Sequence, residues 1–72
     1  MSYRVRIYLQ RVGQSAGGYI GEKDLLKPPA RDARVTFEHE GRMESGRIER
    51  IVPDNWIAGS ELIPTLHVVH NA

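Results

Sequence analysis

The sequence predicts an all-β protein, a small partly open five-stranded barrel with a long glycine-rich loop after the first strand. Two segments alternate apolar and polar residues, which is the side-chain period of a half-buried β-strand. One of them, within residues 34–52, folds back through a polar turn and therefore predicts a central hairpin. Glycine and proline separate the other short apolar segments, as turns do between the strands of a barrel.

The first strand is predicted over residues 3–9. Successive side chains of a strand point to opposite faces, so every second residue belongs to the same face. The apolar face is expected in the core and consists of Tyr3, Val5, Ile7 and Leu9. The other face is basic and aromatic and is expected to meet solvent, with Arg4, Arg6, Tyr8 and Gln10.

A long turn or loop is predicted after this strand. Residues 13–21 contain four glycines among small polar residues, and Tyr19 and Ile20 are the only side chains expected to anchor them. Residues 22–27 are compatible with one helical turn, or with a strand end that carries Leu25 and Leu26 into the core. We favour an irregular loop here, and the prolines at positions 28 and 29 end the segment in either case.

The central hairpin is predicted from a strand over residues 34–39, a turn at Glu40-Gly41-Arg42 and a second strand over residues 46–52. Apolar residues no longer alternate strictly in the second strand, and Gly46 interrupts them. Glycine within a strand is typical of a bulge or bend, so we expect the hairpin to bend there around a small core. The residues expected together in this core are Val5, Ile7, Val35, Phe37, Ile48 and Val68.

The last third of the chain is expected to contain one turn and one strand. Pro53-Asp54-Asn55 has the composition of a turn, and the apolar pair Trp56 and Ile57 follows it. We expect the core to bury this pair, because tryptophan is highly buried on average. An exposed binding platform is the alternative for Trp56. The last strand is predicted over residues 65–70.

The composition predicts one domain over residues 1–72 with a small core, because a chain of this size buries only about 60% of its unfolded surface. The chain has no cysteine, which excludes a disulfide framework and a thiolate metal site and favours a cytoplasmic location. No apolar run approaches the roughly 20 residues of a membrane-spanning helix. We also recognise no signal peptide, so we expect no membrane partner.

The net charge of +1 conceals an uneven distribution. Residues 1–34 carry seven basic and three acidic side chains, whereas residues 35–72 carry three basic and six acidic ones. The candidate binding residues come from the basic part: Arg4, Arg6, Tyr8, Arg11, Lys23, Lys27 and Arg31. They form an electrostatic footprint for a partner if the fold brings them to one face. Otherwise they are the solvated side of a strand, which arginine covers well with its apolar stem.

A family resemblance lies in the central hairpin. The polar approach over residues 29–34, the alternating strand, the turn at Glu40-Gly41-Arg42 and the following Ser45-Gly46-Arg47-Ile48 resemble the hairpin of Src-homology-3-like barrels of the Tudor and ribosomal KOW type. The resemblance covers about 20 residues and implies the fold of a small bacterial barrel protein, not a function. A methyl-lysine-binding Tudor barrel needs a cage of several aromatic side chains. This chain has five, of which at least two fall on core faces: Tyr3, Tyr8, Tyr19, Phe37 and Trp56.

The spacing of reactive residues does not favour catalysis or metal binding. His67 and His70 are three residues apart, which in a strand places them on opposite faces, and His39 supplies no matching pair. No serine lies in a strand-turn-helix elbow, and the glycine-rich segment lacks the ending of a phosphate-binding loop. A barrel this small also has no interior for a substrate. We therefore expect no enzyme, metal, cofactor or small-molecule substrate.

The expected function is that of a non-catalytic protein-binding or adaptor module, which holds a protein partner or a second copy of itself as a homodimer. The alternative is weak binding of RNA or single-stranded DNA through the basic outer face of the first strand. A small metalloprotein or enzyme is the third and least supported interpretation.

Overall fold

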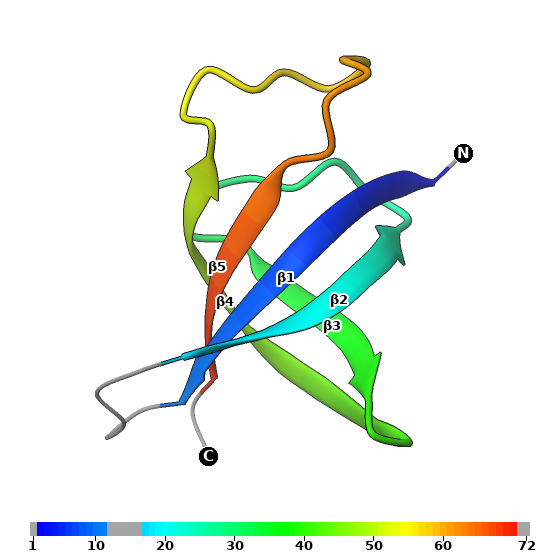
Figure 1. Cartoon of the computed structure of the whole chain (residues 1–72), viewed down its shortest axis with the longest axis vertical. Helices are drawn as coiled ribbons and strands as arrows, with labels where there is room; N and C mark the ends of the chain where they lie inside the picture. Colours follow the sequence, from blue (N-terminus) through cyan, green and yellow to red (C-terminus); the bar gives the residue numbers. More distant parts are fainter. Residues whose placement is uncertain (1, 12–16, 71–72) are drawn as a thin grey trace.

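The computed structural model describes residues 2–11 and 17–70, which form a curled mixed β-sheet (Figure 1). Its five strands are β1 (Tyr3–Arg11), β2 (Gly18–Leu25), β3 (Arg34–His39), β4 (Arg42–Val52) and β5 (Thr65–His70). The all-β, partly open five-stranded barrel predicted from the sequence is confirmed. The described residues contain no helix that would be able to span a membrane.

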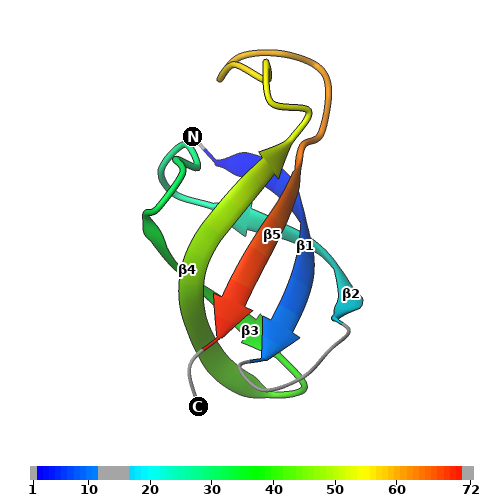
Figure 2. The ribbon, with the colours of Figure 1, turned by 90° about the vertical axis from the view of Figure 1, so that its left-hand side faces the viewer.

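The sheet joins two hairpins through its last strand. The strand order is β2-β1-β5-β4-β3, in which β5 is parallel to β1 and antiparallel to β4. A parallel pair needs a long connection, and here the second hairpin and the segment after it supply that connection. Figure 2 shows β5 between β1 and β4, with β2 and β3 farther from the viewer. The free edges of the sheet are therefore β2 and β3.

The core inside the curled sheet consists of apolar side chains, and no polar or charged residue among those described is buried. The six residues expected together from the strand alternation all lie in it: Val5, Ile7, Val35, Phe37, Ile48 and Val68. Leu9, Leu25 and Leu66 complete it, and Tyr3, Ile20 and Ile51 pack against its margin. The period-two pattern therefore predicted the core correctly.

Strand β2 contradicts the predicted loops over residues 13–21 and 22–27. Residues 12–16 lie outside the described part of the chain, but from Gly18 to Leu25 the chain is a strand that pairs antiparallel with β1. Backbone hydrogen bonds hold an edge strand without an apolar side chain at every second position. The glycine-rich and polar composition of this segment therefore gave the wrong prediction of its secondary structure. Leu25 is buried at the end of β2, whereas Leu26 is 88% exposed.

The glycines of β2 allow an irregular strand rather than preventing one. The register between β1 and β2 shifts between Ile7 and Tyr8, where Ile7 lies opposite Gly21 and Tyr8 lies opposite Tyr19. Gly21 adopts a φ of 117°, which a residue with a Cβ rarely adopts. The extra residue in β2 is a bulge that this glycine makes possible.

The turn between β3 and β4 is the predicted one. Glu40 and Gly41 have φ values of 53° and 76°, and the flanking His39 and Arg42 are paired. Two positive φ values in a two-residue connection are typical of a type I′ hairpin turn, whose twist matches that of the strands.

Gly46 is not the site of a bulge. Gly46 lies opposite Val35 in the regular register of β3 and β4, and the irregularity in β4 falls between Ile48 and Arg50 instead. A Cβ at Gly46 would lie 2.5 Å from the carbonyl oxygen of Val69. Glycine is therefore needed there because β5 approaches β4 closely.

The expectation that the core buries Trp56 and Ile57 is wrong. Residues 53–64 extend beyond the end of the barrel, drawn yellow to orange in Figure 1. Trp56 is half-buried, and its Nε1 donates a hydrogen bond to the carbonyl oxygen of Leu62 at 3.0 Å. Ile57 is 71% exposed. The Trp56 hydrogen bond therefore stabilises the loop over residues 53–64 itself. This loop extends beyond the end of the barrel and does not cover the core.

Replacement of Phe37 by alanine tests the importance of the core. Phe37 is 3% exposed and is the only phenylalanine of the chain. We expect Phe37→Ala to lower the free energy of unfolding by about 3–5 kcal/mol, which is comparable to the total stability of a small domain. Thermal unfolding followed by circular dichroism measures the loss, with the exposed Glu49→Gln as control. A variant that melts within a few degrees of the wild type would contradict the assignment.

Candidate functional site

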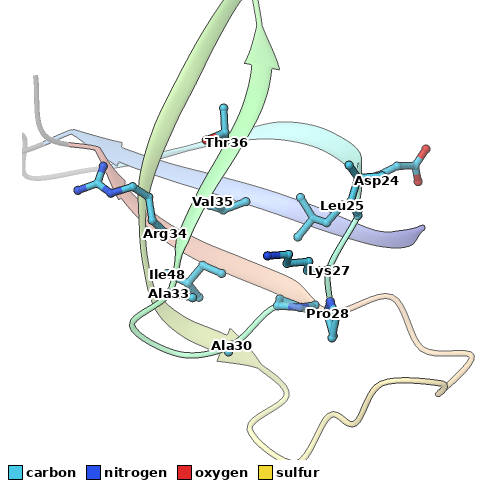
Figure 3. A pocket seen from close by; sticks show the side chains of 12 residues that line it. Asp24, Leu25, Lys27, Pro28, Ala30, Ala33, Arg34, Val35, Thr36 and Ile48 are labelled. Carbon is cyan, nitrogen blue, oxygen red and sulfur yellow. The ribbon is translucent and has the colours of Figure 1, made fainter. Parts of the chain in front are cut away.

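An apolar groove lies between the two free edges of the sheet, on the open side of the barrel (Figure 3). Its volume is about 430 Å³, within the range of ordinary ligand sites. The end of β2, the connection over residues 26–30, the beginning of β3 and Ile48 of β4 line it. The sequence led us to expect no interior for a substrate in so small a barrel, and sequence reasoning did not foresee this space at the seam between β2 and β3.

The floor of the groove consists of side chains that belong to the buried hydrophobic core. Leu25, Val35 and Ile48 belong to the core and also line the groove, and Figure 3 shows these side chains around one space. Pro28 and Pro29 contribute a wall that is conformationally restricted, because a proline ring fixes φ. The groove therefore offers an apolar surface that needs little ordering before it binds.

Two cations belong to the lining of the groove, and Figure 3 shows the Lys27 amino group pointing into the space and the Arg34 guanidinium pointing away from it. No carboxylate of a described residue lies within ion-pair distance of either cation. Asp24 is the only acidic residue in the lining, and its Oδ2 accepts a hydrogen bond from Arg4 at 3.2 Å. Because Arg4 already compensates this carboxylate, the lining retains an excess of positive charge.

The basic residues predicted as one footprint are separated by the fold. Arg4 and Arg6 lie on the outer face of β1, where they meet carboxylates of β2. Arg4 lies 3.2 Å from Glu22 and 3.2 Å from Asp24, and Arg6 lies 3.5 Å from Glu22. Exposed pairs of this kind add little stability, but they reduce the positive potential of the face.

The other predicted cations lie elsewhere. Lys23 is opposite Val5 in the register of β1 and β2, which places it on the inner side of the edge strand. Lys27 lines the groove, and Arg31 is exposed in the turn before β3. The basic half of the sequence therefore does not become one basic face of the molecule.

Arg11 does not extend the basic outer face of β1. It lies at one end of the barrel, where it pairs with Glu44 of β4. Its Nη1 lies 3.6 Å from the Glu44 Oε2, and the His70 Nε2 lies 3.3 Å from the same oxygen. The Glu44 side chain is only 10% exposed. The His70 Nδ1 lies 2.6 Å from the carbonyl oxygen of Ser45 and must donate to it, because a carbonyl oxygen only accepts. This polar cluster joins the ends of β1 and β5 to β4.

The outer face has one aromatic contact at its centre. The ring of Tyr8 lies 5.2 Å from the ring of His67, at an interplanar angle of 36°. The Tyr8 hydroxyl donates a hydrogen bond to the carbonyl oxygen of Gly17 at 3.2 Å. Arg50 of β4 is the register neighbour of His67, and no carboxylate of the described residues pairs with it. A small aromatic and basic patch thus lies across β1, β5 and β4.

Sequence reasoning missed the groove and its apolar lining. The signal is present in Leu25-Leu26 followed by Pro28-Pro29, where an apolar pair meets a rigid connection. From the sequence this segment is only an irregular loop, because nothing in the chain order shows that β2 and β3 are both edges.

Comparison with known proteins does not place this site. None of the family models matches the chain, and no curated protein or solved structure shows significant similarity to it. Within the described residues, no group of three or more histidine or acidic side chains is placed to hold a metal ion. The interpretation of the site therefore depends on its geometry and charge.

The outer patch makes a prediction about the titration of His67. Its pKa is lowered first because burial desolvates the imidazolium and second because Arg50 repels it, while Glu49 acts in the opposite direction. The folded state therefore binds fewer protons than the unfolded state, so this contribution to stability is present above the ordinary histidine pKa of about 6.5 and is lost as pH falls through the lowered value.

A proton NMR titration should give a midpoint below about 6.5 for His67. Arg50→Gln should move the midpoint upwards, because the repulsion is removed, whereas Arg31→Gln in the distant turn should leave it unchanged. A midpoint at or above the ordinary value would contradict the described burial of this side chain.

Proposed function

We propose that this chain is a non-catalytic, cytoplasmic protein-binding module that holds an extended acidic segment of a partner protein in the groove between β2 and β3. The observation that carries the proposal is an apolar groove at the seam of the barrel whose lining cations lack intramolecular partners among the described residues. A partner supplies what this chain lacks, namely apolar side chains to cover the floor and carboxylates to meet the cations.

The occupant follows from the chemistry of the lining. A leucine or similar side chain would bury itself against Leu25, Val35 and Ile48, and removal of apolar surface from water is the main source of affinity in such contacts. A carboxylate next to that anchor would reach Lys27, and one at the outer side of β3 would reach Arg34. A basic segment would be repelled, so the charge of the lining selects the partner more than it strengthens the binding.

Kinship with Src-homology-3-like barrels remains part of this proposal. The hairpin that carries the resemblance corresponds to β3 and β4, which form the outer side of the groove. The resemblance supports a binding module in general terms, because small barrels of many families bind partners at exposed strands and loops.

Three synthetic peptides test the proposed partner chemistry: two adjacent leucines flanked by glutamates, the same leucines flanked by lysines, and glutamate flanks around two serines. Isotope-labelled protein titrated with the first peptide should show NMR shifts at Leu26, Lys27 and Val35. The other two peptides should bind at least about tenfold more weakly, equivalent to roughly 1.4 kcal/mol. Equal binding of the lysine-flanked peptide would refute the proposal.

Variants of the protein locate the binding. Lys27→Glu should weaken the glutamate-flanked peptide by about tenfold or more, because an attractive contact becomes a repulsive one. Leu26→Ser should weaken it through loss of exposed apolar surface. Arg42→Glu carries the same charge change at the far turn of the hairpin and should leave binding unchanged. Equal effects of Lys27→Glu and Arg42→Glu would show that net charge alone is responsible.

Weak binding of single-stranded nucleic acid is the second candidate, and the patch of Tyr8, His67 and Arg50 favours it. An aromatic pair beside a cation without a described carboxylate partner is a surface on which a base can stack while a phosphate is neutralised. The pairing of Arg4 and Arg6 with β2 weakens this candidate, because those cations are already compensated.

Fluorescence anisotropy with a labelled single-stranded RNA tests the second candidate. Each phosphate contact should contribute a slope of about −0.7 to log affinity against log salt concentration. The double variant Arg6→Glu with Arg50→Glu should abolish binding at low salt, and Tyr8→Ala should cost about 1–3 kcal/mol. Arg42→Glu is again the matched control. Absence of salt-sensitive binding at about 20 mM ionic strength, where screening is weak, would exclude this function.

A further inference from the structure

The free edge of β3 has a pattern of charge that is complementary to itself. Arg34, Thr36 and Glu38 are exposed and share the outer face of this edge strand, while Val35 and Phe37 face the core. Neither Arg34 nor Glu38 has an ion-pair partner among the described residues. A cation and an anion therefore lie symmetrically about Thr36 without intramolecular compensation.

The backbone groups of the same three residues point towards the free edge. The carbonyl oxygen of Ala33 accepts a hydrogen bond from the Ile48 nitrogen of β4 at 2.8 Å. Because successive residues of a strand direct their N–H and C=O groups to opposite sides, Val35 and Phe37 also face β4. The N–H and C=O groups of Arg34, Thr36 and Glu38 consequently face away from it, and such a row is a template for another strand.

We propose that two copies of the chain pair antiparallel through β3, with the two-fold axis at Thr36. In this register Thr36 lies opposite Thr36 of the second copy, and the Arg34 of each chain lies opposite the Glu38 of the other. The pairs at positions 34 and 38 and at position 36 are all of the hydrogen-bonded kind, because the backbone groups of these residues face the new strand. Opposite charges directly across a pair of strands are stabilising.

The other edge of the sheet does not fit a second copy in the same way. The outward carboxylates of β2, on Glu22 and Asp24, lie on either side of Lys23. An antiparallel pair of two β2 strands about Lys23 would therefore place acidic side chains opposite each other. Pairing β2 of one copy with β3 of the next would be head-to-tail and would join two different surfaces. The β3 pair about Thr36 uses one self-complementary surface, closes with two copies and is complementary in charge.

The proposed register uses residues 34–38 of each copy. Because Arg34 and Thr36 line the groove beside the end of β2, the second copy would occupy part of the groove. Pairing of one six-residue strand buries less surface than a standard stable interface of about 1,600 Å². The dimer should therefore be weak and should exchange with the monomer as concentration changes. The inference does not depend on the function proposed for the groove.

Sedimentation equilibrium of four proteins tests the register: the wild type, Arg34→Glu, Glu38→Arg and the double variant that exchanges the two charges. The wild type should pass from the 8.2 kDa monomer towards a dimer as its concentration rises. Either single variant should weaken dimerisation roughly tenfold or more, because two attractive pairs become repulsive. The double variant should restore it, since position 34 then meets the opposite charge at position 38 again.

Two further measurements distinguish pairing through β3 from association through another surface of the molecule. Arg42→Glu makes the same charge change on β4 and should leave dimerisation unchanged. The amide of Thr36 should exchange with solvent more slowly as the dimer forms, whereas that of Val35 should be protected at every concentration. A wild type that stays monomeric near 1 mM, or a double variant as weak as the single ones, would overturn the proposal. Failure of peptide binding in the groove would leave it unaffected.

Discussion

The position of β5 between β1 and β4 is the constraint on which the rest of the fold depends. Neither hairpin would be stable alone, because two strands have no second layer to cover their apolar face. β5 pairs with both hairpins and contributes Leu66 and Val68, which are 0% and 1% exposed. The close approach of β5 to β4 also explains why Gly46 has no room for a side chain. One short strand thus turns two marginal hairpins into one curled sheet.

Both proposed binding surfaces follow from that arrangement. Once β5 occupies the centre, β2 and β3 are the edges, and the described chain has no further strand to join them. Core side chains near the seam, such as Leu25 and Val35, therefore line the groove. The same opening leaves the outer edge of β3 without a partner strand. The groove and the edge are two consequences of a barrel that does not close.

The sequence predicted those parts of the fold in which side-chain pattern and backbone pairing agree. Strands β1 and β3 alternate, and their inward residues are the ones found in the core. Strand β2 was missed because its backbone pairs with β1 although its composition is that of a loop. The candidate site was harder to predict than the fold, since it depends on which distant segments meet. Arg4 and Arg11 are equivalent in a count of charge, but the fold gives Arg4 to the carboxylates of β2 and Arg11 to Glu44 at the end of the barrel.

Binding of a partner segment in the groove and dimerisation through β3 use the same strand, so each should affect the other. Arg34 lines the groove and is also one half of the charge pattern at the β3 edge. Its guanidinium can meet a carboxylate of a partner segment or the Glu38 of a second copy, and either contact supplies the compensation that the described part of its own chain lacks. A ligand that binds only the monomer stabilises the monomer and so lowers the population of the dimer. A segment bound beside Arg34 should therefore favour the monomer, and association of two copies should lower the apparent affinity of the groove.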